Sequence, residues 1–193
     1  MTVVTCAPNC PTGKVFDGYR NAWRREEIVD GIRVIRVWSF LSANEGFLRR
    51  ILNFVSYMLT AVWQALWIRK VDVVVATSPQ FFSGWAGVLT HWLKRTPFVL
   101  EIRDIWPESI VTVGAMRRSL AIRLLERLEK WMYSAADSIV TVGNGYRDKL
   151  LERGVTSENI RVVPNGVDLS VWKPQPDSPS LRTRWNGVGR FGC

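Results

Sequence analysis

Residues 98–109 read FVLEIRDIWPES, and this stretch decides the fold class. Its first half is rich in large apolar and β-branched side chains, which predicts a strand over 98–102. The second half changes abruptly to charged and polar residues, beginning with Arg103 and Asp104 and continuing to Glu108. Because ligands of open α/β sheets bind outside the carboxyl ends of the strands, these residues form a candidate site. An ion pair between Arg103 and Asp104, or a helix cap, explains the same charges without a ligand.

Strand-like and helix-like segments alternate on both sides of this stretch. Apolar runs predict further strands over residues 2–6, 32–38, 71–76, 138–142 and 160–163. Helical periodicity predicts helices over residues 46–70, 79–94, 117–136 and 143–154. Residues 14–30 are charged and show no regular pattern. The alternation predicts a doubly wound α/β domain, with a mostly parallel sheet and helices on both faces.

Polar residues follow three other predicted strands. Ser78 comes after the strand at 71–76 and is placed to cap a helix that has Pro79 as its first residue. Asn144 follows the next predicted strand, and Asn165 and Gly166 turn the chain after the last one. Parallel strands end at one edge of a sheet, so we expect these residues to lie on the same edge as Arg103. For any single turn, the sequence favours a helix cap without a ligand over a binding site.

The helix over 46–70 carries no charge from Ile51 to Ile68, which raises the question of a transmembrane span. Its polar residues fall on one narrow stripe, formed by Arg49, Asn53, Ser56, Thr60 and Gln64. Such a stripe is typical of a helix packed on a sheet, and also of a helix lying in a membrane interface. The sequence favours the first interpretation over the second, and either over a span.

The helix over 117–136 is amphipathic. Its predicted apolar face consists of Leu120, Leu124, Leu128, Trp131 and Ala135. Basic residues lie outside this face, interrupted by Glu126 and Glu129, and they read as a solvated surface. The lone histidine, His91, lies far along the helix over 79–94 and is interpreted as an ordinary helix residue.

The composition is that of a basic globular domain. The formal net charge is +9 and the chain contains 10 tryptophans, a combination that suits phosphates, nucleic acid or an anionic membrane surface. A nucleic-acid-binding module would need aromatic residues interleaved with bases on one face, whereas the bases here are scattered. Three cysteines without a CxxC pair indicate a reducing compartment, and one histidine excludes a histidine-rich metal site.

Several segments resemble the N-terminal domain of family 4 glycosyltransferases with the GT-B fold, and in particular the fucosamine transferase branch of O-antigen synthesis. The segments that carry the resemblance are FVLEIRDIWPES, ADSIVTVGNGYRDKLLERGV, ENIRVVPNGVDLSVWKP, TCAPNCPTGKVFDGY and IRVIRVW. The resemblance covers about residues 1–173, which we expect to form one Rossmann-like domain. Residues 174–193 are expected to be a linker and a truncated tail.

This resemblance implies a cleft between two Rossmann-like domains, one for the acceptor and one for the donor. It implies a retaining transfer from a nucleotide-diphosphate sugar, without a metal or other cofactor. Compared with the family pattern, we expect the first strand with its glycine-rich loop, and the C-terminal domain, to be missing from residues 1–193. Arg103 also stands where many members carry a histidine, and a guanidinium cannot act as a base.

The expected roles follow from that resemblance. Asp104 and Arg103 are the expected catalytic residues, with Asp104 and Glu108 on acceptor hydroxyls and Arg103 on a phosphate or sugar oxygen. The remaining substrate contacts are expected from Ser78, Asn144, Asn165 and Gly166. The expected acceptor is a polyprenyl-diphosphate-linked saccharide in surface polysaccharide assembly, at the inner face of the cytoplasmic membrane. The alternative is a truncated, non-catalytic relic of such an enzyme.

Overall fold

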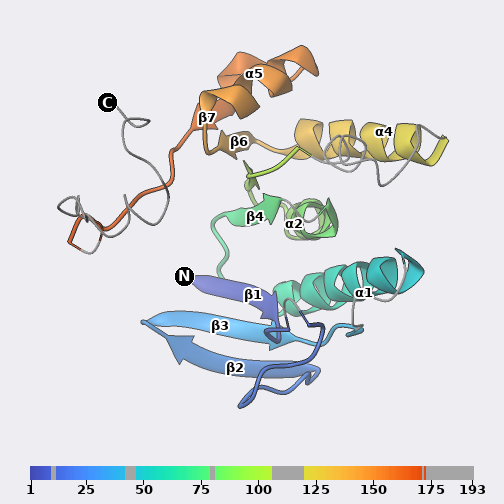
Figure 1. Ribbon diagram of the computed structural model, residues 1–193, viewed down its shortest axis with the longest axis vertical. Helices are drawn as coiled ribbons and strands as arrows, with labels where there is room; N and C mark the ends of the chain where they lie inside the picture. The colour runs from blue at the N-terminus through green and yellow to red at the C-terminus, as the bar shows by residue number, and fades with distance from the viewer. Residues whose placement is uncertain (10–11, 42–46, 79–80, 106–119, 171, 173–193) are drawn as a thin grey trace, which may run out of the picture.

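The computed structural model describes residues 1–9, 12–41, 47–78, 81–105, 120–170 and 172, and it shows alternating strands and helices (Figure 1). The strands are β1 (Thr2–Cys6), β2 (Arg24–Val29), β3 (Ile32–Val37), β4 (Val74–Ser78), β5 (Phe98–Ile102), β6 (Ser138–Thr141) and β7 (Ile160–Val162). The helices are α1 (Phe47–Leu66), α2 (Phe81–Lys94), α4 (Leu120–Ala135) and α5 (Asn144–Glu152), with a short 3-10 helix, η1 (Ser157–Asn159). The predicted α/β class is confirmed.

The strands form two sheets, with the orders β1-β3-β2 and β4-β5-β6-β7. All neighbouring pairs are parallel except β2 and β3, which form an antiparallel pair. The strand pairing is therefore mostly parallel, as predicted, but the described strands form two sheets rather than the one sheet that was predicted.

The prediction that residues 14–30 are irregular is wrong in part, because Arg24–Val29 form strand β2. It is an edge strand of mostly charged residues, joined to β3 by an antiparallel backbone ladder and by ion pairs between side chains. Glu26 accepts hydrogen bonds from Arg33 at 2.8 and 3.0 Å, and Glu27 accepts one from Arg36 at 2.6 Å. A charged edge strand discourages further pairing, and it leaves no apolar alternation to detect in the sequence.

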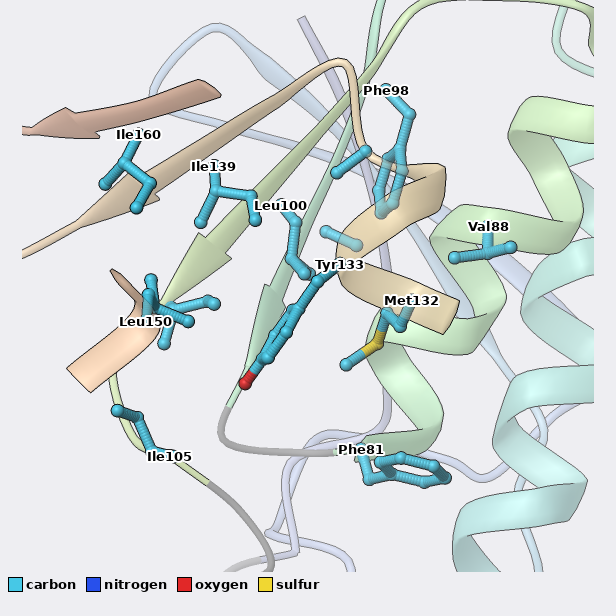
Figure 2. Close-up of a cluster of buried hydrophobic side chains, with 13 residues drawn as sticks. Phe81, Val88, Phe98, Leu100, Ile105, Met132, Tyr133, Ile139, Leu150 and Ile160 are labelled. Atoms are coloured by element: carbon cyan, nitrogen blue, oxygen red, sulfur yellow. The ribbon is translucent and has the colours of Figure 1, made fainter. Parts of the chain in front are cut away.

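The main core lies on one face of the four-stranded sheet. Alternate residues of β5, namely Phe98, Leu100 and Ile102, are at most 1% exposed. Figure 2 shows side chains from three helices meeting this face: Phe81 and Val88 of α2, Met132 and Tyr133 of α4, and Leu150 of α5. Each step from β4 to β7 moves in the same direction, so right-handed crossovers put the connecting helices on one face. The described helices that pack on this sheet thus share a face, whereas the sequence predicted helices on both.

Helix α1 ends at Leu66, four residues before the predicted end, and it packs on β1, β3 and α2. The end of its polar stripe faces inward: Thr60 and Gln64 are 5% and 4% exposed, and the Thr60 hydroxyl donates to the Trp38 carbonyl at 2.7 Å. The opposite side exposes an apolar row, formed by Leu48, Leu52, Leu59, Trp63 and Leu66. Within the described residues, none of the helices combines the length and apolar character that a membrane crossing requires.

The buried face of α4 differs from the predicted one. Leu128 and Ala135 pack against the core, but Leu124 and Trp131 are 58% and 54% exposed. The predicted solvated Glu129 is instead buried, because it ion-pairs with Arg153 at the end of α5 and accepts a hydrogen bond from the Tyr133 hydroxyl at 2.6 Å. Burial, together with the neighbouring Glu129 carboxylate, raises the pKa of Tyr133. Of Leu120, only the backbone lies within the described residues.

Candidate functional site

The carboxyl ends of four parallel strands lie in register along one edge of the sheet. Ser78 of β4 pairs with Ile102 of β5, which pairs with Thr141 of β6, which in turn pairs with Val162 of β7. The residues that follow these ends therefore emerge along a common edge, which we call the carboxyl edge. This is the place where parallel α/β sheets bind ligands.

Backbone and side-chain bonds join the first two strand ends. The Arg103 N–H donates to the Ser78 carbonyl at 3.2 Å, and the Ser78 hydroxyl donates to the Asp104 carbonyl at 3.4 Å. Ser78 is 5% exposed and is the last residue of β4, while the predicted first helical residue, Pro79, lies outside the described residues. Within the described part of the chain, the Asp104 carboxylate makes no hydrogen bond or ion pair.

Arg103 pairs with Glu101 rather than with Asp104. Its Nε and Nη2 atoms lie 3.0 and 2.9 Å from Glu101 Oε1, and the Thr77 hydroxyl donates to Glu101 Oε2 at 2.8 Å. The alternative of an Arg103–Asp104 ion pair is therefore wrong. Burial acts to raise the pKa of Glu101, but the hydrogen bonds from Arg103 and Thr77 outweigh it and hold that pKa below its usual value. Glu101 stays ionised and fixes the guanidinium at the carboxyl edge.

The sequence analysis did not select Glu101 or Thr77. Both lie inside strands, on the sheet face opposite the buried core residues of β5. The available signal was an acidic residue in an otherwise apolar strand, directly before a base. Because residues two apart on a strand point to the same face, that pattern could have identified Glu101 as an ion-pair partner of Arg103.

The other predicted residues spread along the same edge. Asn144 is the first residue of α5, after β6, and Asn165 and Gly166 follow β7; all three are exposed. Ser78 and Asn165 lie on the same edge, as predicted, but three strand spacings of about 4.8 Å separate their strands. They therefore contact different parts of any ligand. Glu108 lies outside the described residues.

The opposite edge of the sheet carries a shallow pocket of about 450 Å³, lined by His91, Trp92, Arg95, Thr96, Pro97 and Asp137. The His91 ring nitrogen Nδ1 lies 2.6 Å from the Thr96 carbonyl, a contact that ties the end of α2 to the start of β5. His91 is thus remote from the carboxyl edge. Among the described residues, no three histidine, cysteine, aspartate or glutamate side chains are grouped to hold a metal ion.

Comparison with known proteins identifies the family. The family model described as "Glycosyl transferase 4-like domain" matches residues 1–166, which include every strand of both sheets. The chain belongs to the glycosyl transferase 4-like family. The resemblance inferred from the sequence segments is confirmed at this level, and the carboxyl edge is a feature of a glycosyl transferase 4-like domain.

Curated relatives of this glycosyl transferase 4-like chain carry transferase names. WcaI of Escherichia coli K12, named as a colanic acid biosynthesis glycosyl transferase, is 22% identical over 183 residues, covering 92% of this chain and 45% of WcaI. WbjE of Pseudomonas aeruginosa, named as a glycosyltransferase, is 30% identical over 127 residues, covering 64% of this chain and 32% of WbjE. The chain thus spans less than half the length of these relatives.

Among solved structures, the chain is similar to HepE of Anabaena in complex with UDP-glucose. The identity is 18%, the TM-score is 0.45, and the match covers 76% of this chain and 36% of HepE. The structure of HepE with UDP and glucose matches with a TM-score of 0.48.

Proposed function

We propose that residues 1–173 form the acceptor-side domain of a retaining glycosyltransferase, which transfers a sugar from a nucleotide-diphosphate donor to a polyprenyl-diphosphate-linked saccharide. The observation that carries this proposal is the carboxyl edge of a glycosyl transferase 4-like domain, where the Asp104 carboxylate is unengaged among the described residues beside an oriented Arg103. A carboxylate accepts hydrogen bonds from sugar hydroxyls, and a guanidinium binds a diphosphate. The name of WcaI, a colanic acid biosynthesis glycosyl transferase, supports a role in surface polysaccharide assembly, and we extend that role to O-antigen.

The role of each predicted residue within this proposal follows its position. Asp104 orients an acceptor hydroxyl, and Arg103 binds a phosphate or sugar oxygen without acting as a base. Ser78 holds the turn after β5 in place through its bond to the Asp104 carbonyl. Asn144 and Asn165 contribute exposed amides farther along the carboxyl edge, where an extended acceptor reaches them.

Residues 1–193 are expected to bind the acceptor without transferring sugar. The reacting atoms of a two-domain transferase meet between the domains, so the donor diphosphate must be held opposite the acceptor. A radiolabelled nucleotide-sugar assay with lipid-linked acceptor tests this, with a full-length relative as positive control. We expect no turnover above that of Asp104→Ala. Turnover above that control would show that this chain holds the donor as well.

We further propose that the exposed apolar row of α1 rests on the anionic inner face of the cytoplasmic membrane. Trp63 of this row is 49% exposed, and exposed bases on α4 add attraction to anionic lipid: Arg123, Arg127 and Lys130. The net charge of +9 is complementary to such a surface.

Vesicle co-sedimentation tests the membrane proposal. We expect the chain to bind phosphatidylglycerol vesicles and to be released in high salt. The pair of substitutions Arg123→Gln and Arg127→Gln should weaken binding roughly 10- to 30-fold, at about 1 kcal/mol per base. Trp63→Ala should weaken it further, whereas Ile28→Ala, on the exposed edge strand β2, should not. Equal binding to neutral vesicles, or no binding, would contradict the proposal.

A further inference from the structure

We propose that the pocket at the end of α2 binds one acidic sugar unit of a saccharide, such as a uronate, with the sugar ring on Trp92 and the carboxylate on Arg95. The pocket lies at the edge of the four-stranded sheet opposite the carboxyl edge, and its volume is about 450 Å³. That volume falls within the range of about 300–1,000 Å³ that is typical of small-molecule sites. This site is separate from the carboxyl edge, so it goes beyond the proposed transferase function and does not depend on it.

The turn that ends α2 holds the pocket residues in place. The Thr96 N–H donates to the His91 carbonyl at 3.3 Å, and Arg95 has a positive φ of 52°. These two features form a Schellman motif, with Arg95 at the position that usually holds glycine. A left-handed backbone is disfavoured for a residue with a Cβ, so Arg95 carries a conformational cost that glycine would avoid. The motif fixes the Arg95 backbone between the last turn of α2 and β5.

Arg95 supplies the cationic group of the pocket. Among the described residues, its guanidinium makes no hydrogen bond or ion pair. The neighbouring Lys94 ammonium is instead engaged at the end of α1, where it donates to the carbonyls of Leu66 and Ile68 at 3.3 and 2.8 Å. A guanidinium can bind a carboxylate through two parallel hydrogen bonds. Arg95 is therefore the residue that would bind an anionic group in this pocket.

Trp92 supplies an apolar surface for the sugar ring. Its side chain is 53% exposed, although it belongs to a helix that packs on the core. Trp85 packs edge-on against it, with 6.3 Å between the ring centroids. This contact supports the indole while more than half of its surface stays accessible. An indole offers an apolar face, on which the C–H groups of a sugar ring can pack, and an N–H donor at its rim.

Asp137 and His91 supply acceptors for sugar hydroxyls. Asp137 Oδ2 accepts from the Phe98 N–H at 2.7 Å, which anchors the carboxylate, whereas Oδ1 has no partner among the described residues. His91 Nδ1 lies 2.6 Å from the Thr96 carbonyl, which cannot donate, so Nδ1 carries the hydrogen. In the neutral ring, Nε2 is then an acceptor. The pocket thus combines a cation, an apolar surface and hydroxyl acceptors, which match the groups of an acidic sugar.

The charges of the pocket favour a carboxylate over a phosphate. Arg95 and Asp137 line the pocket with opposite charges. A sugar carboxylate carries one negative charge, which Arg95 balances, and the sugar hydroxyls can donate to Asp137. A phosphomonoester carries a charge of about −1.5 to −2 at pH 7, so Asp137 would repel it more strongly. A nucleotide, with its base on Trp92 and its phosphate on Arg95, is disfavoured for the same reason.

NMR titration with methyl β-glucuronide tests this assignment. Methyl β-glucoside is the matched probe, because it has the same ring with a hydroxymethyl group in place of the carboxylate. Uridine monophosphate is the probe that carries a base and a phosphate. We expect the glucuronide to shift the Trp92 indole N–H and the backbone amides of Arg95 and Thr96. It should bind at least about tenfold more tightly than the glucoside, since hydrogen bonds to charged groups are the stronger ones.

Two glycine substitutions separate the pocket from the net charge. Arg95→Gly and Lys70→Gly each remove one positive charge from a residue with positive φ, and Lys70 does not line the pocket. Because glycine suits this backbone, neither variant should melt at a lower temperature than the unmodified chain. Arg95→Gly should abolish the preference for glucuronide over glucoside, whereas Lys70→Gly should keep it. Trp92→Ala should weaken the binding of both sugars.

Several results would overturn the assignment. These are equal affinity for the two sugars, no shift at Arg95 with glucuronide at tens of millimolar, and tighter binding of uridine monophosphate at the same residues. Unchanged glucuronide affinity in Arg95→Gly would overturn it as well. Shifts at Ser78 and Asp104 in place of Arg95 would put the acidic sugar at the carboxyl edge, and would leave the pocket without this ligand.

Discussion

Replacing Glu129 by alanine is expected to lower the free energy of unfolding by about 3–5 kcal/mol. The Glu129 side chain is 3% exposed, and it binds both the Arg153 guanidinium and the Tyr133 hydroxyl. Its removal leaves a partly buried guanidinium without this carboxylate and a buried hydroxyl without its acceptor. Breaking one side of a buried ion pair is costly because the remaining charge stays desolvated.

Urea unfolding measures this effect, and Glu126→Ala is the matched control because Glu126 lies on the exposed side of the same helix. The control should change stability by less than about 0.5 kcal/mol. Thermal unfolding of Glu129→Ala should show a melting temperature lower by roughly 6–20 °C. If the two variants were equally stable, Glu129 would have to be solvated, as the sequence pattern suggested.

Gly87→Ala should destabilise the chain by about 1–3 kcal/mol, although alanine favours helix by about 1 kcal/mol over glycine. A Cβ at Gly87 would lie 2.5 Å from Phe98 Cε2 and 2.6 Å from Ala76 Cβ. Phe98 is fully buried, and Ala76 is part of β4, so neither neighbour can move away easily. Glycine at this position lets α2 lie close to β4 and β5.

Gly84→Ala provides the comparison within the same helix. Its Cβ would meet the Met132 sulfur at 2.3 Å, but a methionine side chain can adopt another rotamer. We therefore expect a smaller loss for Gly84→Ala than for Gly87→Ala, measured by denaturant unfolding of both variants. A neutral or stabilising Gly87→Ala would mean that helix propensity outweighs the close approach.

The parallel strands and their ends were predictable because their sequence pattern matches their environment. Buried parallel strands read as apolar runs, and β4 to β7 all appear within a few residues of the predicted segments. Four parallel strands ending in register place Ser78, Arg103 and Asn165 on one edge without any knowledge of side-chain positions.

The features that were not predictable depend on pairing between distant residues. Strand β2 is stabilised by ion pairs of Glu26 and Glu27 with arginines diagonally across on β3, and a charged sequence carries no strand period. The Thr60 side chain of α1 is buried because its hydroxyl donates to the Trp38 carbonyl, which lies 22 residues earlier. The burial of Glu129 depends on Arg153, which lies 24 residues later. A local sequence pattern predicts that a charged side chain is exposed to solvent, unless its ion-pair partner elsewhere in the chain is known.

Binding of an acceptor analogue, followed by NMR, tests the central claim most directly. A soluble short-chain prenyl-diphosphate saccharide should shift the amides of Ser78, Arg103 and Asp104. Asp104→Asn should weaken its binding roughly tenfold or more, since a hydrogen bond to a charged group is worth about 1.5–3 kcal/mol. Asp72→Asn, exposed near the opposite end of β4, should leave the affinity unchanged. Shifts confined to the pocket around His91, with equal affinity for both variants, would contradict the assignment of the carboxyl edge as the acceptor site.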